Sequence, residues 1–253
     1  MKKLVLLIVL SLLSLGGYSQ VQSSEHSFSV APNRSVIFSL GNLQYHAKKN
    51  MYRFANNQYD IIGKAQPQNS MGWCDLFDWK ESNEYVLNDA DAKNWRVLTK
   101  NEWEYLLFER DNASALLGVA KVGGVWGVIV LPDTYSEQGN GFKSFFDLKL
   151  KPGQMWYILE DMIDKYNVYN NQQWASLEQL GAIFLPVTEK LSAQKGKDES
   201  KECYYWSLDY VPTCVGRYYG LAISSLSVNI SEYLREDMHC FVRLVKDVKN
   251  INY

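Results

Sequence analysis

Residues 73–79 combine three aromatic side chains with two carboxylates in a segment that has no sustained apolar period. Sugar rings stack on aromatic faces and donate hydroxyl hydrogen bonds to carboxylates, so this composition is typical of a sugar-binding loop. Buried aromatic side chains that hold a long loop in place give the same pattern, and the sequence leaves both interpretations open. The candidate ligand-binding residues are Trp73, Asp75, Asp78, Trp79, Tyr135, Asp209 and Tyr210.

The chain offers few residues for catalysis. Its three histidines, His26, His46 and His239, are isolated from one another in the sequence. There is no HExxH motif, no GxSxG motif and no glycine-rich phosphate loop, so a metalloprotease, a serine hydrolase and a nucleotide site are not indicated. We predict no catalytic and no metal-binding residues.

Four cysteines, Cys74, Cys203, Cys214 and Cys240, have spacings that match no zinc ribbon and no CxxC redox motif. Cys203 and Cys214 flank a predicted strand and loop, and we take this pair as a candidate disulfide. Four buried free thiols are the alternative. The sequence does not choose among the three connectivities that four cysteines allow.

Residues 1–19 have the pattern of a secretory signal peptide. Lys2 and Lys3 precede the apolar run 4–15, and the small residues Gly16, Gly17 and Ser19 follow. The run is shorter than the roughly 20 residues that a membrane span needs, so we expect cleavage and no later span. This predicts export to the periplasm, the outer surface or the medium. The oligomeric state is not predicted.

The composition is that of a folded domain without affinity for nucleic acid. Apolar residues make up 47% of the chain and aromatic residues 14%, which excludes a disordered chain. Removal of the signal peptide deletes two lysines, and the formal charge becomes 24 − 28 = −4. A chain with this balance has no basic excess to neutralise phosphates, so we expect no nucleic-acid partner.

Three helices are predicted to position the candidate residues. The first, over 99–110, begins with the capping box formed by Thr99 and Glu102, and apolar side chains follow at helical spacing. Further helices are predicted over 154–169 and over 172–180, the latter with Asn171 as its N-cap.

Antiparallel strands are predicted to form the rest of the domain. Gly123 and Gly124 divide the apolar stretch 119–131 into a β-hairpin. The polar segment 20–34 is interpreted as a mobile leader, 35–247 as a single α+β domain with two or three helices, and 248–253 as a polar tail. Further short strands are predicted over 35–38, 52–55, 182–185, 204–207, 218–223 and 240–245.

Two sets of motifs carry a family resemblance. The stretch 95–105, Trp-Arg-Val-Leu-Thr-Lys-Asn-Glu-Trp-Glu-Tyr, resembles a signature of the formylglycine-generating (sulfatase-modifying) superfamily. The segments 41–45, 54–63, 75–79 and 181–186 are similar to motifs of exported Bacteroidetes proteins related to the Fibrobacter succinogenes major paralogous domain. The resemblance implies a C-type-lectin-like fold over about 36–246, like that of the formylglycine-generating enzymes.

Departures from the family pattern limit what the resemblance implies about function. Formylglycine-generating enzymes hold copper with two closely spaced cysteines, and here no two cysteines are close. Gln66-Pro67-Gln68 departs from the calcium triplets of sugar-binding lectins, so calcium has no motif to support it and no cofactor is predicted.

We therefore expect a non-enzymatic binding module that recognises a glycan or a cell-surface protein through long aromatic-rich loops. One alternative is an enzyme of the superfamily with a rearranged site. Another is a structural subunit of a surface appendage.

Overall fold

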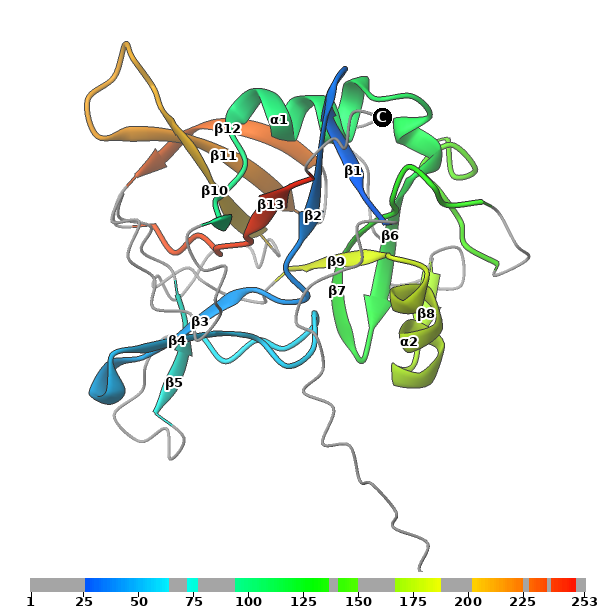
Figure 1. The fold of residues 1–253 in the computed structure, drawn as a ribbon, viewed down its shortest axis with the longest axis horizontal. Coiled ribbons are helices and arrows are strands. Elements are labelled where there is room, and N and C mark those ends of the chain that lie inside the picture. The colour runs from blue at the N-terminus through cyan, green and yellow to red at the C-terminus, as the bar shows by residue number, and fades with distance from the viewer. Residues whose placement is uncertain are drawn as a thin grey trace, which may run out of the picture.

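The computed structural model describes residues 26–63, 72–76, 94–136, 141–149, 167–187, 202–224, 228–235 and 238–248. These residues form a mixed α+β structure in which strands predominate and the two α-helices are short (Figure 1). The strands form four small sheets, and their pairings are antiparallel except that of β6 with β8. No helix of the described residues is long and apolar enough to cross a membrane.

The first sheet joins the two ends of the described chain. It contains β1 (Phe28–Ala31), β2 (Arg34–Phe38) and β13 (Val245–Asp247), in the order β1-β2-β13. Phe28 and Val30 alternate with polar residues and are buried, so they point into the core. The predicted mobile leader 20–34 is therefore wrong for residues 28–34. At the other end, the Val248 amide donates to the Ser35 carbonyl, so residue 248 packs with the domain.

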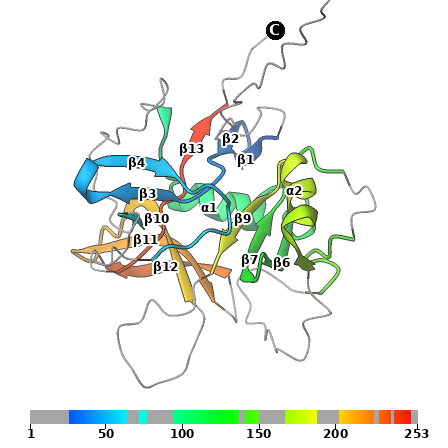
Figure 2. The same ribbon diagram turned by 90° about the horizontal axis from the view of Figure 1, so that it is seen from below.

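The second sheet has the order β4-β3-β5. Its strands are β3 (Leu43–His46), β4 (Met51–Phe54) and β5 (Trp73–Asp75), and the 3-10 turn η1 (Ala47–Lys49) joins the first two. Both β4 and β5 pair antiparallel with β3. Figure 2 shows this sheet and the third sheet on opposite sides of the molecule.

The third sheet confirms the hairpin predicted over 119–131. It consists of β6 (Leu117–Val122), β7 (Val125–Val130), β8 (Asn167–Tyr169) and β9 (Ile183–Pro186). Gly123 and Gly124 both have positive φ, which a two-residue hairpin turn of this hand requires. Of the helix predicted over 154–169, residues 154–166 lie outside the described residues. Residues 167–169 form β8, parallel to β6, so the predicted end of that helix is wrong.

Helix α2 (Asn171–Gln179) covers one face of the third sheet. Its Trp174 and Leu177 are buried in a cluster with side chains of β6, β7 and β9. The helix predicted over 172–180 is thus confirmed. The N-cap is Asn170 and not Asn171, because Asn170 and Gln173 form a reciprocal capping box.

The fourth sheet contains β10 (Glu202–Tyr210), β11 (Arg217–Ser224) and β12 (Val228–Arg235) in sequence order. The predicted strands at 204–207 and 218–223 are confirmed, whereas β12 was not predicted. Of the strand predicted over 240–245, only Val245 belongs to a named strand. Phe241, Val242 and Leu244 instead make isolated backbone hydrogen bonds to neighbouring segments, such as Phe241 N to Tyr204 O at 2.7 Å.

Helix α1 (Lys100–Glu104) continues as the π-helical turn η3 (Tyr105–Glu109) and lies beside β1 and the fourth sheet (Figure 1). Both hydrogen bonds of the predicted capping box are present: Glu102 N donates to Thr99 Oγ1, and Thr99 N donates to Glu102 Oε2. Trp103, Leu106 and Leu107 are fully buried. The helix predicted over 99–110 is therefore confirmed, and its apolar face belongs to the core.

The candidate disulfide between Cys203 and Cys214 is wrong. Both residues are thiols, Cys203 buried in β10 and Cys214 exposed in the turn that follows it. The seven residues from Cys203 to the end of β10 span about 20 Å at the rise of a β-strand, far beyond the reach of a disulfide. The alternative of four buried thiols holds for Cys74, Cys203 and Cys240 but not for Cys214.

Candidate functional site

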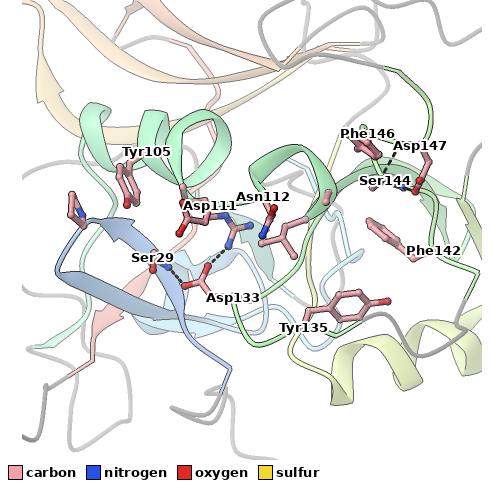
Figure 3. Close-up of a pocket in the computed structure, with 14 residues that line it drawn as sticks. Ser29, Tyr105, Asp111, Asn112, Asp133, Tyr135, Phe142, Ser144, Phe146 and Asp147 are labelled. Atoms are coloured by element: carbon pink, nitrogen blue, oxygen red, sulfur yellow. Dashed lines mark hydrogen bonds and ion pairs between the residues drawn. The ribbon is translucent and has the colours of Figure 1, made fainter.

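A cavity of about 580 Å³ opens between β1, the end of η3, the 3-10 turn η4 (Ala113–Ala115) and two loops, 131–136 and 141–149 (Figure 3). Its walls combine polar and aromatic side chains from segments that are far apart in the sequence. Cavities of this size with convergent polar groups are common ligand sites. The cavity is therefore the candidate functional site of the described residues.

A buried ion pair forms one wall of the cavity. Arg110 is 3% exposed, and its Nη1 donates to Asp133 Oδ1 at 2.8 Å while its Nη2 donates to the Leu131 carbonyl at 2.9 Å. The Ser29 amide donates to the other oxygen of Asp133 (Figure 3). Burial lowers the pKa of Arg110, and the Asp133 carboxylate opposes that effect. The pair joins the end of η3 to the loop that follows β7, and the Ser29 bond joins β1 to the same loop.

Aromatic side chains line much of the remaining wall. Tyr135 and Phe142 meet edge to face, with their ring centroids 6.2 Å apart. Phe146 is 71% exposed, so its ring is accessible to a ligand. Tyr105 of η3 completes the aromatic set. These rings give a ligand several apolar faces on which to pack.

Polar groups stand beside the aromatic rings. Asp111 and Asn112 follow η3, and Asp147 lies in the loop that also carries Phe142 and Phe146 (Figure 3). The amide and the hydroxyl of Ser144 both donate to Asp147 Oδ2, at 2.9 and 2.7 Å. The hydroxyl bond, followed by the amide bond, holds the pKa of Asp147 below its ordinary value. Asp147 is therefore ionised and held in one orientation at neutral pH.

Only Tyr135 of the described candidate residues lines this cavity. Trp73 and Asp75 lie on β5 in the second sheet, and Asp209 and Tyr210 lie on β10 in the fourth. Asp78 and Trp79 fall outside the described residues. The structure thus does not bring the predicted ligand-binding residues together into one site.

Asp75 has a structural role. It is 2% exposed and accepts hydrogen bonds from the amides of Ile62 and Gly63, each at 2.8 Å, and from Gln44 Nε2 at 3.2 Å. Burial raises its pKa, although these three hydrogen bonds act in the opposite direction. Asp75 therefore fixes the loop after β4 against β3 and β5.

Trp73 is engaged by neighbouring side chains. The Arg53 guanidinium lies 4.2 Å from the centre of the Trp73 ring, and His46 meets the ring edge to face. An aromatic face that already carries a guanidinium is less available to a sugar. These contacts favour the interpretation in which Trp73 holds the loop in place.

Asp209 also serves the fold, whereas Tyr210 is exposed. Asp209 Oδ2 accepts a hydrogen bond from the Lys100 amide at 2.6 Å, at the first residue of α1. A carboxylate at a helix N-terminus satisfies an amide that has no partner within the helix. Tyr210 is 66% exposed at the end of β10.

The residues of the superfamily-like stretch 95–105 likewise hold the fold together. Glu102 is buried and pairs with Arg96 and Arg34, and Arg96 also pairs with Asp247 of β13. The stretch therefore fastens α1 to the first sheet.

Arg243 is a further charged residue with a structural role, and it is buried. It is 1% exposed and donates to the carbonyls of Ser39 and Phe184 and to Asn42 Oδ1. Burial lowers its pKa to about 10, against the favourable influence of Tyr205 and Glu178. Arg243 thus links the chain before β3 with β9.

The cavity residues that the sequence reasoning missed include Asp111, Asn112, Phe142, Phe146 and Asp147. A local pattern was present, because residues 142–147 read Phe-Lys-Ser-Phe-Phe-Asp, with aromatic side chains close to a carboxylate. The opposite side of the cavity comes from η3 and η4, about 30 residues earlier in the chain. No local sequence pattern indicates that the two sides of the cavity lie close together in the folded chain.

The described residues hold no group of three or more His, Cys, Asp and Glu side chains that could bind a metal ion. Comparison of the chain with protein-family models, with curated proteins and with solved structures yields no match.

Proposed function

We propose that this protein is an exported, non-enzymatic binding module that recognises a glycan in the cavity between η3, η4 and the loops 131–136 and 141–149. The observation that carries the proposal is the composition of the cavity wall. Tyr105, Tyr135 and Phe146 offer accessible aromatic surface, the largely buried Phe142 packs against Tyr135, and exposed carboxylate and amide groups belong to the same wall. A sugar presents the matching surfaces, since its ring has apolar C–H faces and hydroxyls at its edge.

The structural roles of the motif residues support a binding module over an enzyme. Arg96 and Glu102 belong to the stretch 95–105 that resembles the formylglycine-generating superfamily, and they pair with each other in a contact that holds the fold. The resemblance accordingly supports a shared C-type-lectin-like fold more than a shared reaction. We propose that the protein has the C-type-lectin-like fold and is related to the exported Bacteroidetes proteins.

The placement of the buried cysteines also disfavours the superfamily enzyme. Cys203 packs in the core cluster around β1 and α1, whereas Cys240 packs in a different cluster with Leu43 and Trp95. Burial raises the pKa of the Cys240 thiol, so it is protonated at neutral pH. A copper site of the superfamily type requires two adjacent thiolates, and this arrangement does not supply them.

The proposal is tested by screening the exported protein against a broad glycan panel, with and without calcium, and by titrating any hit calorimetrically. Phe146→Ala is the most informative variant because Phe146 is exposed and its removal leaves the core intact. We expect Phe146→Ala and Tyr135→Ala to weaken binding by about fivefold or more, as removal of an anchoring aromatic residue does. Tyr210→Ala, an exposed aromatic residue outside the cavity, is the matched control.

Three outcomes contradict the proposal in different ways. If a folded sample binds no glycan of the panel, glycan recognition is overturned and a surface-protein partner becomes the better candidate. Binding that survives both cavity variants but falls in Tyr210→Ala places the site on β10. Self-association of the purified protein at micromolar concentration, without glycan binding, supports a structural subunit instead.

A further inference from the structure

The charges on the cavity wall do not cancel. Arg110, Asp111, Asp133 and Asp147 are the charged lining residues, three acids and one base. Arg110 and Asp133 form an ion pair at 2.8 Å and neutralise each other. Asp111 and Asp147 remain as two exposed carboxylates without a cation among the described lining residues. Lys143 and Lys149 belong to the same loop as Asp147 but do not line the cavity.

The single base of the wall is not available to an anionic ligand. The Arg110 side chain is 1% exposed, and its two terminal nitrogens already donate to Asp133 and to the Leu131 carbonyl. A carboxylate or sulfate on a ligand would face the negative charges of Asp111 and Asp147, with no available positively charged side chain among the described lining residues to balance it. Like charges in a partly enclosed site repel more strongly than they do in bulk water.

The aromatic rings of the wall, like the two carboxylates, favour a positively charged ligand. The face of an aromatic ring carries negative potential and attracts cations, most strongly where water is partly excluded. Phe146 and Phe142 come from the same loop as Asp147, and Tyr135, which meets Phe142 edge to face, comes from the neighbouring loop. A site that pairs ionised carboxylates with aromatic faces favours a cation that carries some apolar surface.

From this arrangement we infer that the cavity selects a glycan carrying a positively charged amine, such as a hexosamine unit without its acetyl group, over neutral and acidic glycans. This inference rests on the proposed function and adds the chemical class of the ligand. Amines of the ligand are placed beside Asp111 or Asp147, which lie on opposite sides of the cavity (Figure 3), and the sugar rings pack on the aromatic wall.

The test compares three probes of similar length: an oligomer of glucosamine, an oligomer of N-acetylglucosamine, and an oligogalacturonate. Affinities are measured calorimetrically at about pH 6, at low and at high salt. We expect the glucosamine oligomer to bind at least about fivefold more tightly than the acetylated one at low salt. The difference is expected to shrink at high salt because exposed charges are screened. The oligogalacturonate is expected to bind most weakly.

Two charge-removing variants locate the effect. Asp111→Asn and Asp147→Asn are each expected to reduce the preference for the amine by about threefold, as one partly exposed ion pair does. The affinity for the acetylated oligomer is expected to stay the same. Glu104→Gln removes the same charge from α1, outside the cavity wall, and is expected to change neither value.

The outcomes separate the two proposals. Equal affinity for the amine and the acetylated oligomer, or tighter binding of the acidic one, overturns the inference and leaves glycan recognition standing. A preference for the amine that survives both aspartate variants also overturns it. Failure of a folded sample to bind any of the probes or any glycan of the panel overturns the proposed function itself.

Discussion

Arg96 donates two hydrogen bonds of 2.8 Å to Glu102, one to each carboxylate oxygen. The same guanidinium donates to both oxygens of Asp247, at 3.1 and 2.6 Å. Glu102 also closes the capping box at the start of α1, so one carboxylate serves a helix terminus and an ion pair at once. Through Arg96, the beginning of α1 is fastened to β13, the last strand of the described chain.

Glu102→Gln is expected to destabilise the protein strongly. Glutamine keeps one acceptor for the Thr99 amide but leaves Arg96 and Arg34 without the buried negative charge that balances them. Breaking a buried ion pair from one side costs about 3 kcal/mol or more. Asp247 still pairs with Arg96, which places the expected loss of unfolding free energy at the lower end of that range. Urea unfolding followed by tryptophan fluorescence measures it.

Glu104→Gln is the matched control on the same helix. Glu104 pairs with Lys100 one turn away, and both side chains are partly exposed. A surface pair of this kind contributes about 0.3–0.5 kcal/mol. Equal losses in the two variants would contradict the structural role assigned to Glu102.

The contribution of Glu102 is expected to depend on pH. Burial by itself raises its pKa, but the hydrogen bonds from Arg96 and from the Thr99 amide outweigh burial and hold the pKa below its ordinary value. A carboxylate whose folded pKa is depressed stabilises the protein above its unfolded pKa of about 4.3. That stabilisation is lost as the pH falls through the folded pKa. The difference in stability between the natural protein and Glu102→Gln is therefore expected to be full at pH 7 and to shrink below about pH 4.

Cys214 is expected to be the one thiol of the four that reacts in the folded protein. It is exposed in the turn after β10, whereas Cys74, Cys203 and Cys240 are buried. Alkylation with iodoacetamide under native conditions, followed by mass spectrometry, is expected to add one label per chain, and four after unfolding. Cys214→Ser is expected to abolish native labelling without changing stability. Native labelling of two or more positions, or no labelling at all, would contradict the placement of these residues.

Elements defined by contacts close in sequence could be predicted, and elements defined by distant contacts could not. Thr99 and Glu102 allow the start of α1 to be predicted, because their hydrogen bonds join residues that are three positions apart. Gly123 and Gly124 predict the β6–β7 hairpin, because the turn and the two strands that it joins are adjacent in the sequence. The π-helical turn over 105–109 was not predicted, because nothing in the local spacing distinguishes it from an α-helix.

The role of Asp75 illustrates why the predicted site was not found. Its partners Ile62, Gly63 and Gln44 lie 13, 12 and 31 residues away. Because no partner is close in the sequence, Asp75 could not be told apart from an exposed, ligand-binding aspartate. The cavity has the same origin, since β1, the end of η3 and two loops meet only in the folded chain. The strand β1 could have been recognised, because Phe28 and Val30 alternate with polar neighbours.

The ion pair between Arg110 and Asp133 is expected to respond unequally to removal of its two members. Asp133→Ala leaves the Arg110 guanidinium, which is 1% exposed, without its counter-charge, and it also removes the acceptor of the Ser29 amide. Stranding a buried charge costs about 3–5 kcal/mol. Arg110→Met fills a similar volume with an apolar side chain, and Asp133, whose side chain is 31% exposed, stays in contact with water. Both donors of Arg110 are then lost, but only the Leu131 carbonyl is left buried without its donor, at a cost of about 1–3 kcal/mol.

The expected order of stability is thus the natural protein, then Arg110→Met, then Asp133→Ala, as determined from chemical unfolding at pH 7. The reverse order would mean that the guanidinium finds another anion or water when Asp133 is absent. Because Asp133 lies on the cavity wall, Arg110→Met also adds one negative charge to the site. It is therefore expected to strengthen binding of a cationic probe relative to a neutral one, the opposite of the change expected for Asp111→Asn. A variant that lowers stability while sharpening the preference for cations would separate the structural role of this pair from the charge of the cavity.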